Sequence, residues 1–282
     1  MSVYKVIYNP SAGNGTGERE ARKLSDILKG EKLEYIDATK NVDYNELFSK
    51  MDKEDNIIIS GGDGTLNHFI NDTKDIGYTN DVYYFATGTG NDFLLDIGGK
   101  KGEIINITKY LKGLPSVFVN GKEYKFINGV GYGIDGYCCE EGDKLRSLGE
   151  KINYTAIAIK GLLFHYKPKN AVVTVDGTEY SFKKAWLAPT MFGRFYGGGM
   201  MSAPEQNRLA EDKKVSCMVM FGAGKIKTLI VFSSIFKGGH VNHKDMCRVI
   251  SGKEIEVRFD RPAAVQIDGE TITGVSSYRV VF

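Results

Sequence analysis

Three times within its first third, the chain passes from a short apolar segment through a glycine-rich loop into a stretch with helical spacing. The loops are residues 9–17, 61–65 and 87–93. In an open α/β sheet such loops gather at the carboxyl edge of the strands, where one ligand can touch them all. The alternation of strand and helix up to Leu114 therefore predicts a mainly parallel sheet covered by helices.

The middle loop, Gly-Gly-Asp-Gly-Thr at residues 61–65, predicts an anion site. Glycines let backbone N–H groups face a ligand, and the helix that follows adds positive potential at its N-terminus. A carboxylate is unfavourable in such a place unless it holds Mg²⁺ or takes a proton from an attacking hydroxyl, and phosphoryl transfer needs both roles. Asp63 occupies this position. The alternative is a tight turn in which Asp63 is a cap.

The loops resemble the motifs of the diacylglycerol kinase catalytic domain family, which also holds sphingosine and ceramide kinases and many bacterial lipid kinases. The resemblance is carried by Asn-Pro at 9–10 with Gly13, the 61–65 loop with Asn67, Gly-Thr-Gly-Asn-Asp-Phe at 88–93, and Asp-Gly-Glu at 268–270. Their order and spacing cover nearly the whole chain. One position departs from the family, since His68 stands where members usually have Glu. A neutral His can accept a hydrogen bond but brings no fixed negative charge.

The resemblance implies that the loops bind ATP with Mg²⁺ and that a carboxylate acts as the general base. Asp63 is the first candidate for this base and Asp268 the second, because relatives use one or the other. Without the resemblance, residues 266–270 are typical of a type I′ hairpin turn. The nucleotide-binding residues expected from the resemblance are Asn9, Gly13, Gly61, Gly62, Gly64, Thr65, Thr89, Asn91 and Glu270.

Two more acidic residues match family positions. Asp135, within the glycine-rich segment 129–136, resembles a residue that holds the acceptor headgroup in sphingosine-type relatives; the alternative is a loop Asp that caps its own turn. Asp212 resembles a position that contributes to a structural Mg²⁺ site in some bacterial members. Here Lys213 and Lys214 replace the glycine expected after it.

A domain boundary is expected at residues 113–115, where Gly-Leu-Pro follows a helix predicted to carry Ile104, Ile107, Tyr110 and Leu111. The sequence thus predicts a nucleotide-binding α/β domain at 1–115 and a lipid-substrate domain at 116–282. In the second domain, hairpin turns at 120–121 and 176–177 join short strands, which indicates an antiparallel β-sandwich. The strands are predicted at 116–119, 124–128, 171–175, 178–182, 184–189, 215–221, 248–250, 254–259, 264–267 and 278–282.

Two helical stretches interrupt these strands, at residues 143–166 and 225–237. Their apolar faces can pack on the sandwich or shape a cleft for acyl chains. In the second stretch, Lys225, Lys227 and Lys237 flank the apolar residues and can meet anionic headgroups.

The composition of the chain limits the classes of molecule that it can bind and the compartment in which it works. The 37 Lys and Arg against 35 Asp and Glu give a net charge of +2, which provides no global basic field for nucleic acid. No apolar run reaches the length of a spanning helix, so a lipid would be met from the water side. Four cysteines without paired spacing, and no secretory segment before them, indicate free thiols and a cytoplasmic protein. For a lipid substrate without a spanning segment, peripheral association with the membrane is expected.

The sequence therefore predicts a lipid kinase that transfers the γ-phosphoryl group of ATP to a lipid hydroxyl, with diacylglycerol as the first acceptor. One alternative is NAD kinase, which shares the 61–65 loop, although residues 90–93 have the lipid-kinase form. The other is a nucleotide-binding relative with little kinase activity, suggested by His68 and by Lys213 and Lys214 after Asp212. A homodimer is compatible with the sequence, which does not fix the oligomeric state.

Overall fold

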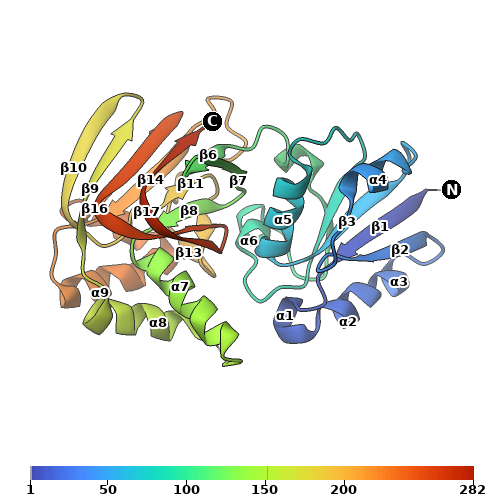
Figure 1. Ribbon diagram of the computed structural model, residues 1–282, viewed down its shortest axis with the longest axis horizontal. Helices are drawn as coiled ribbons and strands as arrows, with labels where there is room; N and C mark the ends of the chain where they lie inside the picture. The colour runs from blue at the N-terminus through green and yellow to red at the C-terminus, as the bar shows by residue number, and fades with distance from the viewer. Residues whose placement is uncertain (1, 151) are drawn as a thin grey trace. The chain divides into compact units, whose positions relative to one another are not determined.

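The computed structural model describes residues 2–150 and 152–282. The chain forms two compact units that divide between Leu114 and Pro115 (Figure 1). This division lies one residue before the boundary predicted from the helix breakers at residues 113–115.

The first unit is built on a five-stranded sheet in the order β2-β1-β3-β4-β5, in which only β5 runs antiparallel to its neighbour. The strands are β1 (Val3–Tyr8), β2 (Lys32–Asp37), β3 (Asn56–Gly61), β4 (Val82–Ala86) and β5 (Ile104–Asn106). The helices are α1 (Ala12–Gly15), α2 (Gly17–Arg22), α3 (Leu24–Ile27), α4 (Tyr44–Ser49), α5 (Asp63–Thr73), α6 (Asp92–Asp96) and the 3₁₀ turn η1 (Thr108–Tyr110). The predicted α/β fold with a mainly parallel sheet is confirmed.

Helices cover both faces of this sheet, because its central strands are apolar on both sides. On one face Val6 and Ile58 pack with Leu24, the first residue of α3. Successive side chains of a strand point to opposite faces, so the neighbours of these residues turn to the other side. There Tyr84 of β4 packs edge-to-face on Phe93 of α6, with ring centroids 5.8 Å apart.

The prediction of a helix carrying Ile104, Ile107, Tyr110 and Leu111 is wrong. Residues 104–106 form the edge strand β5, in which Ile104 pairs with Phe85 of β4. The β-branched side chains fit a half-buried sheet edge, which outweighs their helical spacing. Only the single turn η1 follows the strand.

The second unit contains a ten-stranded antiparallel sheet in the order β15-β14-β11-β8-β16-β17-β6-β7, with β9 joining β16 to β10, and a small β12-β13 ladder. Its strands are β6 (Ser116–Val119), β7 (Lys122–Lys125), β8 (Gly129–Tyr132), β9 (Lys169–Val175), β10 (Thr178–Ala185), β11 (Thr190–Met191), β12 (Phe195–Tyr196), β13 (Met200–Met201), β14 (Val215–Met220), β15 (Cys247–Gly252), β16 (Glu254–Ile267) and β17 (Glu270–Val281). The sheet folds into the predicted antiparallel sandwich.

Local turn chemistry places the two predicted hairpins correctly. Asn120 and Asp176 adopt left-handed conformations, with φ of 49° and 47°, and each precedes a glycine. The strands predicted at 254–259 and 264–267 are instead one strand, β16, whose register shifts between Arg258 and Ala263. The first part of β16 pairs with β9 and the last part with β8. An irregular strand that pairs at both ends in this way joins the two layers of a sandwich.

The strand predicted at 184–189 also differs from the structure. The strand β10 ends at Ala185, and beyond it Leu187 makes only single bridges to Gly133 and Met220. Lys184 adopts φ of 55°, which interrupts the extended conformation before Leu187.

The helices of the second unit are α7 (Ile134–Ser147), α8 (Tyr154–Lys160), the π-helical turn η2 (Gly161–His165), α9 (Lys225–Ser233), and the 3₁₀ turns η3 (Ser234–Lys237) and η4 (Gly239–Asn242). The single helix predicted at 143–166 is therefore wrong in its bounds; residue 151 of that prediction lies outside the described residues. The first helix starts at Ile134 within a glycine-rich segment that resembles a loop. A Cβ at Gly136 would lie 2.0 Å from the backbone oxygen of Ala264, so α7 approaches β16 as only glycine permits.

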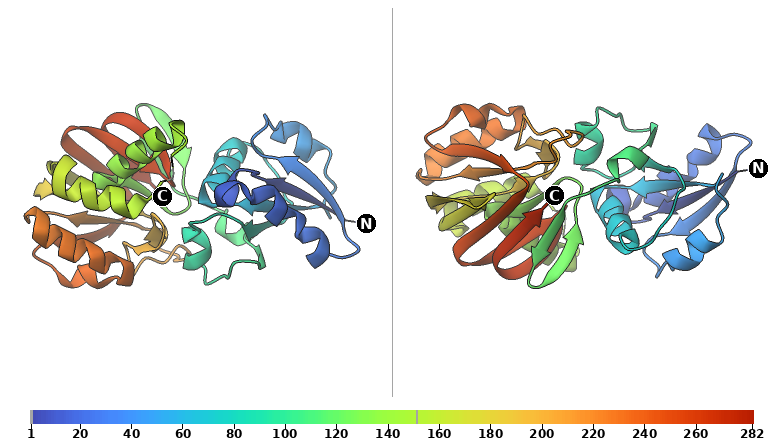
Figure 2. Two further views of the ribbon diagram at one scale, coloured as in Figure 1. Left: turned by 90° about the horizontal axis from the view of Figure 1, so that it is seen from below. Right: turned by 90° about the horizontal axis from the view of Figure 1, so that it is seen from above.

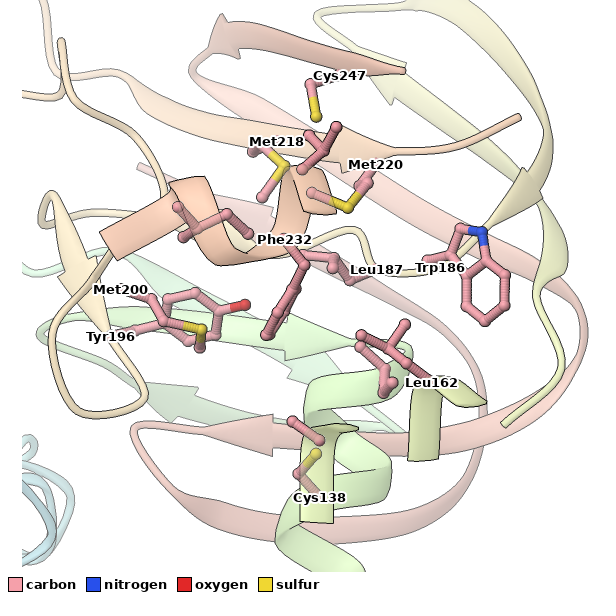
Figure 3. Close-up of a cluster of buried hydrophobic side chains, with 14 of the residues drawn as sticks. Cys138, Leu162, Trp186, Leu187, Tyr196, Met200, Met218, Met220, Phe232 and Cys247 are labelled. Carbon is pink, nitrogen blue, oxygen red and sulfur yellow. The ribbon is translucent and has the colours of Figure 1, made fainter. Parts of the chain in front are cut away.

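The helices α7, α8 and α9 lie on one side of the strands of the second unit (Figures 1 and 2). Figure 3 shows the apolar cluster that joins them to the sheet, with Cys138 of α7, Leu162 of η2 and Phe232 of α9 facing Met218 and Met220 of β14. These side chains are almost completely buried. The cluster therefore fixes the helical side of the unit to the sandwich.

In the part of the chain that the structure describes, no helix combines the length and the apolar character needed to cross a bilayer.

Candidate functional site

The three glycine-rich loops touch one another in the first unit. A Cβ at Gly88 would lie 2.6 Å from the Cα atom of Gly62, and a Cβ at Gly13 would lie 2.6 Å from the backbone oxygen of Thr87. The third loop thus lies in backbone contact with both of the others. Side chains at these positions would separate the loops, so the glycines are required by this close approach.

Hydrogen bonds fix the loops further. The N–H groups of Thr87 and Gly88 both donate to the backbone oxygen of Gly61, at 2.9 and 3.3 Å. The Asn9 amide donates to the Thr65 hydroxyl at 3.3 Å, which links the first loop to the second. The buried Tyr84 hydroxyl also donates to the Gly61 oxygen, at 3.2 Å. The structure therefore brings expected nucleotide-binding residues of the first two loops, Asn9, Gly61 and Thr65, into contact with each other or with the third loop.

Asp63 is the first residue of α5 and connects the second loop to the third. Its carboxylate accepts hydrogen bonds from the backbone N–H groups of Asp92, at 2.7 Å, and Phe93, at 3.3 Å. These groups belong to the N-terminus of α6, where the helix dipole stabilises negative charge. Asp63 is thus a helix cap, but for α6 and not for its own helix. The two donors hold its carboxylate in one orientation at the meeting point of the loops.

Two side chains at these loops carry no motif signal in the sequence. Tyr84 is completely buried, and this burial, with the nearby charges of Asp63 and Asp92, raises the pKa of its hydroxyl well above 10. It therefore stays a hydrogen-bond donor. The Lys101 ammonium donates to the Gly88 oxygen at 3.2 Å and brings a positive charge to the third loop. In the sequence, Lys101 is one of two consecutive lysines after α6, and no motif marks it as part of a site.

The remaining family positions of the first unit are partly structural. The Asn91 amide donates to the Gly88 oxygen at 3.0 Å, directly before α6. Asn67 is buried within α5, whereas Thr89 and His68 are exposed. The exposed position of His68 on α5 accommodates an imidazole without a buried charge.

In the second unit, Asp268 lies in the turn between β16 and β17 with φ of 46°. Its carboxylate accepts three backbone N–H groups, from Ile127 at 2.7 Å, Asn128 at 2.8 Å and Gly129 at 3.0 Å. The buried Arg208 donates to the oxygen of the same Ile127, at 2.8 Å. Asp268 therefore holds the segment that leads into β8, in addition to forming the hairpin turn expected without the resemblance.

Glu270, the second carboxylate of the Asp-Gly-Glu motif, is the first residue of β17 and is exposed. Asp212, the expected Mg²⁺ residue, forms a salt bridge of 3.1 Å with Lys214. Within residues 2–150 and 152–282, no group of three or more His, Cys, Asp or Glu side chains is arranged to hold a metal ion.

Asp135 lies in the first turn of α7, not in a loop as the sequence suggested. It is only 8% exposed. One carboxylate oxygen accepts the Gly136 N–H at 2.9 Å, and the other accepts the Tyr196 hydroxyl at 3.2 Å. Burial raises the pKa of Asp135 to about 6, against the opposing effect of these two hydrogen bonds. The side chain is a buried acid whose pKa lies well above the ordinary value for aspartate.

Tyr196 is the partner that the sequence did not reveal, because it lies on the short strand β12, far along the chain. Its ring belongs to the apolar cluster of Figure 3. Burial and the neighbouring Asp135 raise the pKa of its hydroxyl well above 10. Tyr196 thus remains a proton donor to the carboxylate throughout the physiological pH range.

Comparison with known proteins agrees with these motifs. Residues 3–117 match the diacylglycerol kinase catalytic domain, and residues 128–281 match the YegS C-terminal NAD kinase beta sandwich-like domain. The chain is 24% identical to the protein YtlR of Bacillus subtilis (strain 168), over 99% of this chain and 96% of that protein. It is 23% identical to a diacylglycerol kinase of the same organism, over 96% of this chain and 90% of the relative.

Among solved structures, the chain is similar in fold to a diacylglycerol kinase from Bacillus anthracis str. Sterne, with a TM-score of 0.66 and 23% identity. The likeness covers 99% of this chain and 94% of the solved one. With both domain matches in chain order, the chain belongs to the diacylglycerol kinase family, in which a diacylglycerol kinase catalytic domain precedes a YegS-type β-sandwich domain.

Proposed function

We propose that this chain is an ATP-dependent lipid kinase, which transfers the γ-phosphoryl group of ATP to a lipid hydroxyl, with diacylglycerol as the first acceptor. The observation that carries the proposal is the mutual contact of three glycine-rich loops, two of which the Asp63 carboxylate links. Family membership supports a phosphotransferase, and the site offers the two components that such a reaction needs, an anion cradle and a fixed carboxylate.

The glycine loops fit the phosphate chain of ATP. A Cβ at Gly62 would meet the Gly88 Cα at 3.3 Å, so the loop surfaces are pure backbone at their point of contact. Such surfaces let a phosphate approach N–H groups closely. Lys101 adds a positive charge beside the third loop. Mg²⁺ bound with the nucleotide would neutralise part of the phosphate charge.

The proposed nucleotide-binding residues are Asn9, Gly13, Gly61, Gly62, Gly64, Thr65, Thr89, Asn91 and Glu270, as the family motifs imply.

Asp63 is the proposed general base. The N–H groups of α6 fix its orientation, so it does not need to reorganise when it accepts a proton from the acceptor hydroxyl. The other candidate, Asp268, already binds three backbone N–H groups. We assign to Asp268 the role of bracing the segment before β8.

Asp135 is the proposed contact for the lipid headgroup. It lies almost fully buried, with Tyr196 donating to one oxygen, in a unit with an extensive apolar core. A polar group of the lipid headgroup that donates a hydrogen bond to the Asp135 carboxylate would offset part of the cost of burying its negative charge.

Replacing Gly62 by Val tests the nucleotide site. The added side chain would enter the contact with Gly88, so we expect the variant to lose the rise in melting temperature that ATP with Mg²⁺ gives to the native protein. The matched control is Gly77→Val, since a Cβ at Gly77 has open space around it. Thermal unfolding with and without ATP measures the effect. An undiminished rise in the Gly62 variant would place the nucleotide elsewhere.

The lipid reaches the enzyme from a membrane surface in this proposal, through peripheral association. On α9, Ile226 and Ile230 lie one turn apart and are 74% and 64% exposed. Phe164 of the neighbouring turn η2 is 71% exposed, and the Lys225 ammonium donates to the oxygen of Leu163 in the same turn, at 2.6 Å. Apolar side chains beside lysines suit the interface of an anionic bilayer.

The double variant Ile226→Ser with Ile230→Ser is expected to weaken vesicle binding about tenfold or more, since each buried isoleucine contributes on the order of 1 kcal/mol or more. The affinity for ATP should not change. Sedimentation with vesicles measures the effect, with Ile27→Ser, an exposed isoleucine of the first unit, as the control. Equal binding of the double variant and the native protein would remove α9 as the docking surface.

The lysines of the same helical region give a second readout of this surface. Replacing Lys225, Lys227 and Lys237 by Gln should reduce the salt dependence of vesicle binding, because each lysine near an anionic surface contributes about 1 kcal/mol that salt screens. Lys227 already pairs with Asp245 at 2.6 Å, so its share should be the smallest of the three.

NAD kinase is the second candidate function. The observation that favours it is the match of residues 128–281 to an NAD kinase beta sandwich-like domain. A nucleotide-binding relative with little kinase activity is the third, on the ground of His68. Assaying labelled ATP with lipid acceptors and with NAD separates all three.

A further inference from the structure

We propose that a groove in the second unit binds a phosphate group at a site separate from the proposed acceptor contact. The groove has a volume of about 300 Å³ and lies between the start of α7, the segment after η2 and the irregular part of β16. Its charged and aromatic lining consists of Tyr137, Glu140, His165, Tyr166, Lys167, Lys169 and Arg261. Neither Asp135 nor Asp268 is among its described lining residues.

The surroundings of the Lys169 ammonium carry most of the argument for an anion site. Its ammonium is half-buried, lies 4.6 Å from the centre of the Tyr166 ring, and donates to the Tyr166 hydroxyl at 3.3 Å. Among the described residues, no carboxylate lies within 4.0 Å of this ammonium. Burial and the positive charge of Arg261 lower the pKa of Lys169, and the nearby Asp260 carboxylate opposes them only in part. A half-buried ammonium beside a guanidinium is unfavourable unless an anion joins them.

The other cations are placed to share that anion. Arg261 lies in the register shift of β16 and donates to the Pro168 oxygen at 3.4 Å, while Lys167 is exposed in the connecting segment. An irregular strand re-aims its side chains, which here turns Arg261 towards the segment that carries both lysines. Cations from two distant parts of the chain therefore converge on one groove.

The acidic groups nearby have other partners. Glu140 forms a salt bridge of 3.2 Å with Lys144 on the outer turn of α7. Asp260 accepts from the Asn170 amide at 3.0 Å and lies 3.6 Å from the Arg261 Nε atom. These contacts weaken the repulsion that the two carboxylates would exert on an incoming anion.

A phosphate group matches this arrangement best, because its charge and its several oxygens suit one guanidinium and two ammonium groups together. It can arrive as a lipid headgroup or as soluble phosphate. The exposed Phe164, whose ring lies 6.4 Å from that of His165, provides an apolar neighbour for a lipid. The inference does not depend on kinase activity, since it concerns binding alone.

The test compares phosphate binding to three forms of the full chain. The double variant Lys169→Gln with Arg261→Gln removes two charges from the groove. The matched control, Lys183→Gln with Arg258→Gln, removes two exposed charges from β10 and the same strand β16. Calorimetric titration with inorganic phosphate is the soluble arm, and sedimentation with phosphatidic acid in phosphatidylcholine vesicles is the lipid arm. Any phosphate that binds at the glycine loops binds equally to all three proteins, so it does not contribute to the difference in affinity between them.

We expect the groove variant to bind at least tenfold more weakly than the control in one arm or both. A loss in the vesicle arm alone assigns the phosphate to a lipid, and a loss in the soluble arm alone assigns it to a free phosphate. Equal affinities of the groove variant and the control in both arms would overturn the proposal. If the double variant melts early, the single variant Lys167→Gln, at an exposed position, takes its place with the same expected direction.

Discussion

Replacing Asp63 by Asn is expected to lower kcat about 100-fold or more while the protein stays folded. General base catalysis typically contributes about 10² to 10⁴ in rate, and an amide cannot accept the proton. The Asn side chain keeps one oxygen for the N–H of Asp92, so the contact between the second and third loops survives in part. Steady-state kinetics with ATP and diacylglycerol vesicles, beside a melting curve, measures the effect.

The control is Asp75→Asn, an exposed carboxylate shortly after α5, which should leave kcat unchanged. An Asp63→Asn enzyme that keeps more than about a tenth of native kcat would exclude the base role, because the loss would be too small for such a carboxylate.

The second large effect concerns stability at Asp135. Its folded pKa, about 6, is above the ordinary value of 3.8, so the folded protein binds more protons than the unfolded chain between these values. The stabilisation is therefore complete below pH 3.8 and is lost as pH rises through about 6. Above that range the ionised side chain costs about 3 kcal/mol, since each pH unit between the two pKa values is about 1.4 kcal/mol.

We expect Asp135→Asn to remove this part of the pH dependence, so that the variant gains stability relative to the native protein between pH 4.5 and 7.5. It should also lose activity on lipid, if Asp135 contacts the headgroup. Urea unfolding at the two pH values measures the change. The control Asp143→Asn, at a half-buried residue of the same helix paired with Arg146, should keep the native slope. An identical slope in Asp135→Asn and native protein would contradict the buried-acid assignment.

Local patterns account for what could be predicted from the sequence. The strand, glycine loop and helix transitions of the first unit are set by residues within a few positions of each other, as are the hairpin turns at Asn120 and Asp176. Local patterns placed elements wrongly where tertiary contacts decide which secondary structure forms and where it begins. The segment from Ile104 became a strand because β4 offered it an edge, and α7 began early because Gly136 fits against Ala264.

The site shows the same division. The family motifs identify Asp63 and the loops, but Tyr196 and Lys101 contribute through contacts that no spacing encodes. Asp268 is the clearest case, since its three N–H donors lie at residues 127–129, far away along the chain. The sequence predicts that Asp268 is either a turn residue or the general base. It does not predict the hydrogen bonds by which Asp268 holds the segment before β8.

The most direct test of the central claim is the fate of the γ-phosphoryl group. The protein is incubated with γ-labelled ATP, Mg²⁺, NAD and mixed vesicles that contain diacylglycerol, and the lipid and water phases are separated. The account predicts label in a phosphorylated lipid, dependent on the vesicles and lost in Asp63→Asn. Label in NADP with none in the lipid phase, or no transfer to either acceptor, would contradict it.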